Sequence, residues 1–322
     1  MRDSGGRVRH LALRSLSALA VLLVVSMATF ALGRTAPGST AGTIAVRQAG
    51  QGASQDQVER IRHELRLDDP LPAQYLAWLG RAATGDLGVS ERSGRPVAEE
   101  IGERLPRTLG LGAVAAALAV VTGVGVGVLA ATVRRGPLPA LARGGALTAA
   151  STPSFWLSFL LIWLLCERLR LLPTSGMSGP ASWVMPCLVL ATPAAATISR
   201  AVTVATSTAL ARPFVTAARA RGVPAWSPVP RDALPHALVA TLDVTSVQIG
   251  LVLTGTVVVE TIFGWPGLGA WFLAAVSFRD QGAVLAAVLV YAAMFLAVTR
   301  SADLLRERLD PRLRDRPIGA RR

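Results

Sequence analysis

The chain has 322 residues, of which 52% are hydrophobic, and it carries a formal net charge of +13. Several apolar runs exceed the roughly 18 residues that mark a membrane-spanning helix, which excludes an ordinary soluble domain. The chain contains no lysine, so it cannot hydrolyse ATP through a phosphate-binding loop of the GxxxxGKS/T type. Strong basicity is also typical of nucleic-acid-binding proteins, but in a membrane protein it indicates loops retained on the cytoplasmic side.

The first apolar run extends from Leu11 to about Leu32 and follows the arginines at positions 2, 7, 9 and 14. A cleaved signal peptide is one reading of this pattern. The run is long enough to span a bilayer, however, and no clean cleavage pattern follows it. We therefore interpret residues 1–33 as an N-terminal tail and an uncleaved first transmembrane helix.

Residues 34–107 differ from the rest of the chain because acidic and basic side chains nearly balance there. A short amphipathic pattern predicts a helix, with Ser54 as its N-cap and Gln57 completing a capping box. Pro70 and Pro72 are expected to end that helix. The segment is too small for an independent enzyme, and we expect a helical insert outside the cell that packs on the membrane part.

Five more apolar segments follow, approximately at residues 108–133, 149–165, 184–205, 239–263 and 283–305. The first of them contains Gly123, Gly125 and Gly127. The small-xxx-small spacing of Gly123 and Gly127 favours close approach of a neighbouring helix. A glycine-rich nucleotide loop is the alternative, but no predicted strand precedes these glycines.

Arginines in the loops indicate the orientation of these spans. They occur between the second and third spans, between the fourth and fifth, and in the tail: Arg134, Arg135, Arg143, Arg212, Arg219, Arg221, Arg231, Arg306, Arg308, Arg312, Arg314, Arg316, Arg321 and Arg322. The positive-inside rule then predicts an all-α integral membrane protein with six transmembrane helices and both termini in the cytoplasm. Its core is a five-helix unit at 108–305 with a cytoplasmic loop at 206–238, followed by a basic tail at 306–322.

No residue pattern indicates catalysis, a cofactor or a metal site. Cys166 and Cys187 lie in or beside apolar runs, where small buried apolar side chains are a better reading than a disulfide. The three histidines fall in predicted loops or tails, and no nucleophile–base arrangement is present. A membrane-embedded enzyme is therefore the weaker alternative to a non-enzymatic membrane protein.

The loop "TAARARGVPAWSPVPRDALP", from Thr216 to Pro235, is basic and rich in proline. It resembles the signature loop of permease subunits of ABC importers, whose general form is E-A-A-x3-G-x9-I-x-L-P. Thr216 stands in place of the acid and Asp232 in place of the isoleucine. The positions that fit the pattern are Ala217, Ala218, Gly222, Leu234 and Pro235.

Further segments resemble the dipeptide/oligopeptide/nickel branch of that family, in the family's order. They are "LRLDDPLPAQYLAWLG", "GDLGVSERSGRPVAEEIGERLPRTL", "STPSFWLSFLLI", "FVTAARARG", "VVVETIFGWPGLG" and "LDPRLR". The resemblance implies a multi-pass permease in the cell membrane that encloses a translocation path with a second, homologous permease. It implies two cytoplasmic ATPase subunits and an extracytoplasmic substrate-binding protein as partners, with no role for nucleic acid. Dipeptides, longer peptides, nickel chelates and sugar oligomers all remain possible substrates.

In this family the signature loop forms short helices that dock on the ATPase. The resemblance therefore implies that the loop from Thr216 to Pro235 couples ATP hydrolysis to transport, with Arg219 and Arg221 orienting the contact. Gly222 is expected to end a helix in a left-handed cap. Pro224, Pro228 and Pro230 depart from the pattern, which leaves two readings: an adapted ATPase partner, or a degenerate permease that acts as a membrane scaffold or sensor.

At the opposite end of the fifth span, Glu260 precedes "FGWPGLG". We expect a turn and a short re-entrant or interfacial helix there, forming an external gate or a contact with the binding protein: Trp265, Pro266, Gly267 and Gly269. An aromatic membrane-interface anchor is the alternative for the tryptophan. The carboxylate could be hydrated, paired with an arginine such as Arg279, or in contact with substrate. Asp243, near the inner end of the span, is expected to be hydrated.

Overall fold

A computed structural model describes residues 4–35, 45, 54–64, 68–133, 137–222 and 233–309. Within these ranges the chain is helical and forms no strand, apart from an isolated bridge between Val89 and Pro96. The chain divides into two compact units. The first unit comprises Met1–Arg107 and Pro266–Ala293, and the second comprises Thr108–Trp265 and Met294–Arg322.

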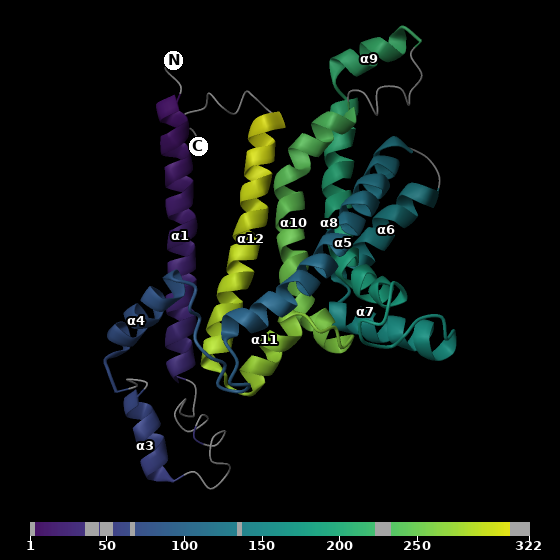
Figure 1. Cartoon of the computed structure of the whole chain (residues 1–322). Helices are drawn as coiled ribbons and strands as arrows, with labels where there is room; N and C mark the ends of the chain where they lie inside the picture. Colours follow the sequence, from purple (N-terminus) through teal and green to yellow (C-terminus); the bar gives the residue numbers. More distant parts are fainter. Residues whose placement is uncertain are drawn as a thin grey trace. The chain divides into compact units, whose positions relative to one another are not determined.

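The first unit is built from the N-terminal helices and from a later internal segment of the chain (Figure 1). They are α1 (Ser4–Thr35), α3 (Gln55–Glu64), α4 (Leu71–Ala83), the start of α5 (Val97–Thr132), α11 (Leu268–Ser277) and the start of α12 (Gln281–Leu309). Tyr75 of α4 contacts α1, because its hydroxyl lies 2.8 Å from Ser26 Oγ and its ring packs edge-on against Phe30. Most of the described apolar side chains of α1 remain exposed, as expected for a helix that faces lipid.

The capping box predicted for α3 is confirmed. The Ser54 N–H donates to Gln57 Oε1 at 2.9 Å, and the Gln57 N–H donates to Ser54 Oγ at 3.3 Å. The prediction that the two prolines end this helix is wrong, because Pro70 instead precedes α4 and Pro72 lies in its first turn. Proline is tolerated there because N–H groups in the first turn of a helix have no acceptor within the helix. A residue that lacks an N–H therefore loses no helical hydrogen bond at that position.

A buried carboxylate, Asp280, joins the start of α12 to the loop before α5. It accepts hydrogen bonds from Ser90 Oγ, from the Arg92 N–H at 3.2 Å and from the Ala283 N–H at 3.1 Å. The last bond caps the N-terminus of α12, where a negative charge is favourable. The first two fix a loop far away in sequence, so this carboxylate organises one end of the first unit.

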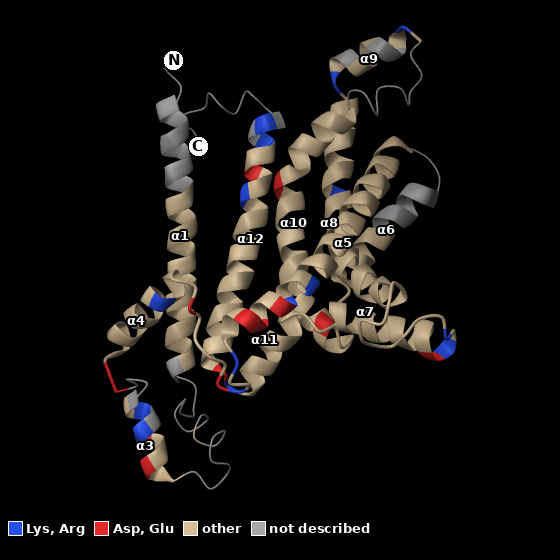
Figure 2. Cartoon of the chain, in the orientation of Figure 1, with Lys and Arg blue, Asp and Glu red and all other residues tan. Residues whose placement is uncertain are grey.

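The second unit contains most of the apolar spans (Figures 1 and 2). Its elements are α5 from Thr108 onward, α6 (Pro137–Ser151), α7 (Ser154–Leu161), the π-helix η2 (Ile162–Arg168), α8 (Ala181–Leu210), α9 (Pro213–Ala220), α10 (Leu234–Ile262) and the end of α12. Helices α8 and α10 pack together along their length, and α9 lies at the end where the chain passes from one to the other. Charged side chains are sparse on α8 and α10, so their contact is largely apolar.

The predicted packing role of Gly123 and Gly127 is confirmed. A β-carbon added at Gly123 would lie 2.9 Å from the Ala195 carbonyl oxygen, and one added at Gly127 would lie 2.7 Å from the Ser199 carbonyl oxygen, both on α8. Gly125 faces open space. The two glycines therefore let α5 approach the backbone of α8, as small residues do between membrane helices.

The segment expected as a single span at 149–165 is broken in the structure. Helix α6 ends at Ser151, and α7 with η2 continues at an angle of 103° to the last turns of α6. Pro153 explains the break, since it lacks an N–H and disfavours helical geometry in the residue before it. The pair is a broken span or a re-entrant loop.

Among the described residues, five helices are long and apolar enough to cross a membrane, and six if the bent pair forms one span. This agrees with the predicted number of spans, while the side on which each loop lies stays a prediction. Cys166 and Cys187 are free and buried, as expected for small apolar side chains. The expectation that Asp243 is hydrated agrees with the structure, because its side chain is 62% exposed, and its carboxylate also pairs with Arg306 of α12.

Candidate coupling loop and outer gate

Helix α9, which carries the first part of the predicted coupling loop, packs on its neighbours in the second unit through a buried apolar side chain. Val215 is fully buried and clusters with Ala209 and Leu210 at the end of α8 and with Ala233 at the start of α10. Pro213 is the first residue of α9, a position where proline is favourable. The cluster orients α9 relative to the two spans that it connects.

Gly222 ends this element in the left-handed conformation that the sequence predicted, with φ = +84°. The preceding residue closes the last turn, because the Arg221 N–H donates to the Ala217 carbonyl oxygen at 3.3 Å. A β-carbon at Gly222 would meet nothing within 4 Å. Glycine is therefore favoured at this position by the backbone angle and not by crowding.

The other residues of the predicted coupling loop lie on α9 or at the start of α10. Thr216, Ala218 and Arg219 lie on α9, whereas Leu234 and Pro235 are the first two residues of α10. The intervening prolines at 224, 228 and 230 lie outside the described residues. The sequence motif thus marks the end of one helix and the beginning of the next.

Glu260 lies near the end of α10 and is fully buried. Its Oε1 accepts a hydrogen bond of 2.7 Å from the hydroxyl of Thr108, which is also fully buried. A buried carboxylate is strongly unfavourable unless polar groups stabilise it, so this bond helps to retain the side chain in an apolar bundle. The ion pair expected with Arg279 stays a prediction.

Trp265 lies in the turn that follows Glu260 and is only 1% exposed. The backbone N–H of Trp265 donates to the Glu260 carbonyl oxygen at 2.8 Å. The indole ring of Trp265 meets the ring of Trp183 edge to face, with centroids 4.8 Å apart. The Gly176 N–H donates to the Phe263 carbonyl oxygen at 2.8 Å, which fixes the other side of the turn. Such deep burial contradicts the alternative that Trp265 is an exposed membrane-interface anchor.

The remaining residues of the predicted gate belong to the first unit. Pro266 accepts a hydrogen bond at its carbonyl oxygen from Arg107 Nη1 at 3.1 Å. Gly267 is the N-cap of α11, and Gly269 lies in the first turn of that helix. The expected turn and short helix are therefore present, and the site residues divide into a pair in the second unit, Glu260 and Trp265, and three in the first.

Helix α11 is held in the first unit by a second buried carboxylate, Glu100 of α5. The indole Nε1 of Trp271 donates to Glu100 Oε2 at 2.8 Å. Arg104 lies 3.5 Å from Glu100 Oε1, and its guanidinium stands over the Trp271 ring, 5.7 Å from the centroid. Trp271 thus gives the carboxylate a hydrogen-bond donor, and Arg104 gives it a countercharge.

Sequence reasoning did not find Thr108, Trp183, Glu100 or Trp271 as partners of the site. Thr108 pairs with Glu260, Trp183 with Trp265, and Glu100 with Trp271. The two residues of each pair lie more than 80 positions apart in the chain, and no local spacing in the sequence indicates such a contact. The described residues contain no cluster of His, Cys, Asp or Glu that could hold a metal ion.

Taken together, a helical bundle of apolar spans, a short helix between two of them and a buried polar turn define a multi-pass helical membrane protein. Residues 123–315 match the family described as binding-protein-dependent transport system inner membrane component, and residues 7–112 match the N-terminal part of that component. The chain belongs to this family. It is a permease subunit of an ATP-driven import system in the inner membrane, working with a binding protein and with an ATPase in separate subunits.

Curated relatives match almost the whole chain. The chain is 33% identical to the probable D,D-dipeptide transport system permease protein of Escherichia coli K12, over 91% of this chain and 94% of the relative. It is 32% identical to the glutathione transport system permease protein of the same strain, over 94% of this chain and 97% of the relative. A putative peptide transport system permease protein of Brucella abortus strain 2308 is 34% identical, with the same coverage.

Solved structures share the fold. An inward-facing structure of the methionine ABC transporter MetNI superposes with a TM-score of 0.54 and 20% identity, covering 65% of this chain and 96% of that one. A crystal structure of an amino acid ABC transporter with histidines gives a TM-score of 0.52 and 20% identity, covering 65% and 94%.

Proposed function

We propose that this chain forms half of the translocation path of an importer for dipeptides, oligopeptides or a similar small solute. A second, homologous permease completes the path, two ATPase subunits bind on the cytoplasmic side, and an external binding protein delivers the solute. The observation that carries this proposal is the near full-length similarity to permeases named for D,D-dipeptide, glutathione and peptide transport. A nickel-chelate permease and a degenerate permease acting as a scaffold or sensor are the alternatives.

Uptake by cells tests the substrate class. Cells that lack this chain, and the same cells supplied with it, would be given labelled di- and tripeptides or labelled nickel with a small chelator. We expect the chain to restore peptide uptake and to leave nickel uptake unchanged. Restored nickel uptake alone would favour a nickel-chelate permease, and no restored uptake of any solute would favour the scaffold or sensor.

For the topology, we propose that both termini and the 206–238 loop are cytoplasmic and that residues 34–107 are outside. The arginine distribution supports this orientation. With Cys166 and Cys187 replaced by alanine, Arg221→Cys and Asp86→Cys provide a matched pair of exposed probes. An impermeant thiol reagent applied to intact cells should label position 86 only, and labelling of position 221 would overturn the orientation.

For the coupling loop, we propose that Ala217, Ala218 and Gly222 form the contact with an ATPase subunit and that Arg219 and Arg221 orient it. The support is the motif together with a short helix that Val215 anchors to α8 and α10. A bulky side chain at a closely packed contact produces a clash, so Ala218→Trp should uncouple ATP hydrolysis from import. Replacing either arginine should have a milder effect, because partly exposed ion pairs contribute only about 0–1 kcal/mol.

Substrate-stimulated ATPase activity of the reconstituted complex would measure that uncoupling. Arg212→Ala is a suitable control, since this exposed residue immediately precedes α9. Full stimulation in the Ala218→Trp complex would show that α9 is not the coupling element.

For the outer gate, we propose that Glu260 fixes the turn at Trp265 and that this turn, with Pro266, Gly267 and Gly269, controls access from outside. Glu260→Gln keeps the side-chain size and an oxygen acceptor for the Thr108 hydroxyl, but it removes the charge. We expect normal assembly and reduced import. Full import would show that the charge is dispensable, and loss of the protein from the membrane would assign Glu260 a structural role.

A further inference from the structure

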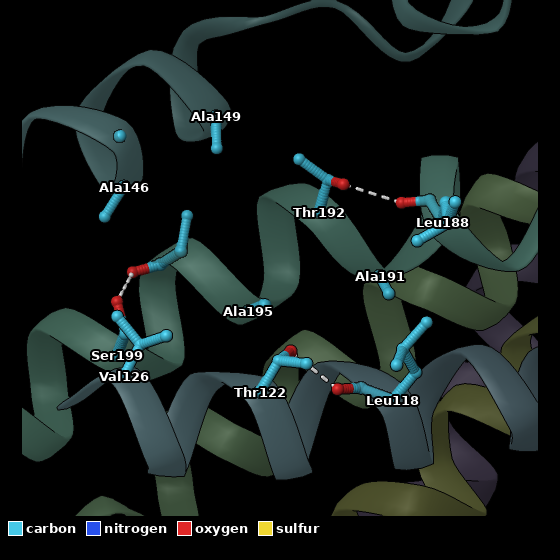
Figure 3. A pocket seen from close by; sticks show the side chains of 12 residues that line it. Leu118, Thr122, Val126, Ala146, Ala149, Leu188, Ala191, Thr192, Ala195 and Ser199 are labelled. Atoms are coloured by element: carbon cyan, nitrogen blue, oxygen red, sulfur yellow. Dashed lines mark hydrogen bonds between the residues drawn. The ribbon is translucent and has the colours of Figure 1, made fainter. Parts of the chain in front are cut away.

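A cavity of about 380 Å³ lies among helices α5, α6 and α8 in the second unit (Figure 3). Its walls are formed largely by aliphatic and small side chains from all three helices, among them Leu118, Val126, Ala146, Ala149, Leu188 and Ala195. The alanines account for the space, because their side chains are too short to meet across the three helices. The cavity is far larger than the ~10–15 Å³ that a single water molecule requires.

The hydroxyl groups in the wall already donate to their own helices. Thr122 Oγ1 donates to the Leu118 carbonyl oxygen at 2.6 Å, and Thr192 Oγ1 donates to the Leu188 carbonyl oxygen at 2.6 Å. Ser199 Oγ donates in the same way within α8 (Figure 3). None of the described residues that line the cavity is charged. A peptide would leave its charged ends and backbone groups poorly satisfied there, which separates this cavity from a peptide-binding site.

The cavity opens beside apolar side chains that are exposed in the isolated chain. Thr122, Val126 and Leu188 at the mouth are exposed, whereas Ala191 and Ala196 are buried at the floor. Neighbouring residues on the same helices, such as Val121 and Leu147, are apolar and 72% and 60% exposed. Apolar side chains on a membrane-spanning helix are suited to contact with hydrocarbon, and an apolar cavity excludes water in favour of apolar ligands.

We propose that this cavity is a lipid site that holds part of one acyl chain of a membrane phospholipid between α5, α6 and α8. The acyl chain enters from the bilayer through the exposed mouth and fills space that side chains leave open. Occupation by an acyl chain does not depend on which solute is transported.

Photolabelling tests the proposal directly. The purified complex in lipid nanodiscs would contain a trace of phosphatidylethanolamine with a diazirine in the middle of one acyl chain, and labelled residues would be mapped by mass spectrometry. We expect labelling to concentrate on the cavity segments of α5 and α8, at 118–126 and 188–199, above the level on the exposed face of α1. Equal labelling on all exposed helices would overturn the proposal.

A cavity-filling variant provides the second arm. Ala195→Phe should lower labelling of the cavity segments by at least about tenfold, because exclusion of only two methylene groups already corresponds to that factor. Val121→Phe is the matched control: it places the same phenylalanine side chain on α5 outside the cavity and should leave the labelling unchanged.

Two outcomes would contradict the lipid site in this arm. Cavity labelling that persists in Ala195→Phe would show that the acyl chain lies elsewhere. Labelling that is present in the isolated chain but absent from the assembled complex would show that another subunit covers the cavity. If Ala195→Phe fails to assemble, Ala149→Leu fills the cavity from α6 and is judged by the same criteria.

Discussion

The contact between α5 and α8 permits a stability prediction with an internal control. In Gly127→Ala, the new β-carbon would lie 2.7 Å from the Ser199 carbonyl oxygen and 2.7 Å from Val202 Cβ. Neither neighbour is the flexible end of a side chain, so the two helices must separate. Gly125→Ala makes the same chemical change two residues away, where nothing lies within 4 Å.

The magnitudes of the opposing effects decide whether Gly127→Ala raises or lowers the stability of the protein. Overpacking of a tight contact typically costs about 1–3 kcal/mol, and alanine regains about 1 kcal/mol of helix propensity over glycine. Separation of the helices also weakens the hydrogen bond from Thr203 Oγ1 to the Gly127 carbonyl oxygen, worth about 0.6 kcal/mol between membrane helices. We therefore expect Gly127→Ala to lose roughly 1–2 kcal/mol and Gly125→Ala to be neutral or slightly stabilising.

Thermal unfolding of the purified protein in one detergent measures this difference. At about 2–4 °C per kcal/mol, Gly127→Ala should unfold several degrees below the wild type, and Gly125→Ala should not. Equal destabilisation by the two alanines would refute the reasoning, because it would show that flexibility and not close helix approach is what the glycines provide.

Three further predictions rest on single contacts. Gly222→Val should abolish substrate-stimulated ATP hydrolysis without loss of the protein, because a β-branched residue is strongly disfavoured at φ = +84°; normal stimulation would contradict a fixed left-handed cap. Trp271→Phe should lower the unfolding free energy by about 1–3 kcal/mol, since it removes a donor from the buried Glu100 carboxylate, and an unchanged unfolding temperature would count against that role. Asp243→Asn should change stability by less than about 1 kcal/mol because its pair with Arg306 is partly exposed, and a much larger loss measured by thermal unfolding would contradict this estimate.

The sequence predicted features that depend on short spacings. Gly123 and Gly127 are four residues apart and therefore lie on one face of a helix, so their packing role follows from the pattern alone. The capping box of α3 and the left-handed Gly222 are equally local, since each is decided by a few neighbouring residues. The number of apolar spans follows from run length, and it agrees with the helices of the described residues.

The bend between α6 and α7 was missed for a different reason. By hydropathy, residues 149–165 form one continuous apolar run. The break depends on a single residue, Pro153, and a hydropathy value contains no information about its effect on backbone geometry. Pro70 was misread because proline favours the first turn of a helix as well as the region beyond its end.

The partners of the candidate site depend on tertiary contacts. Glu260 stands out in the sequence because a carboxylate is rare in an apolar span, but nothing near it indicates Thr108 as its donor. The same holds for the pair of Glu100 with Trp271, which joins α5 to α11. The cavity among α5, α6 and α8 is likewise created by the packing of three helices and has no local motif.

Import into proteoliposomes tests the central claim most directly. The proposed complex of this chain with a second permease and two ATPase subunits would be reconstituted, supplied externally with the binding protein and a labelled peptide, and loaded internally with ATP. We predict peptide accumulation that requires ATP, the binding protein and this chain, and that is lost in Gly222→Val while the complex remains intact. Accumulation that continues without this chain, or ATP hydrolysis without any movement of peptide through the wild-type complex, would contradict the account.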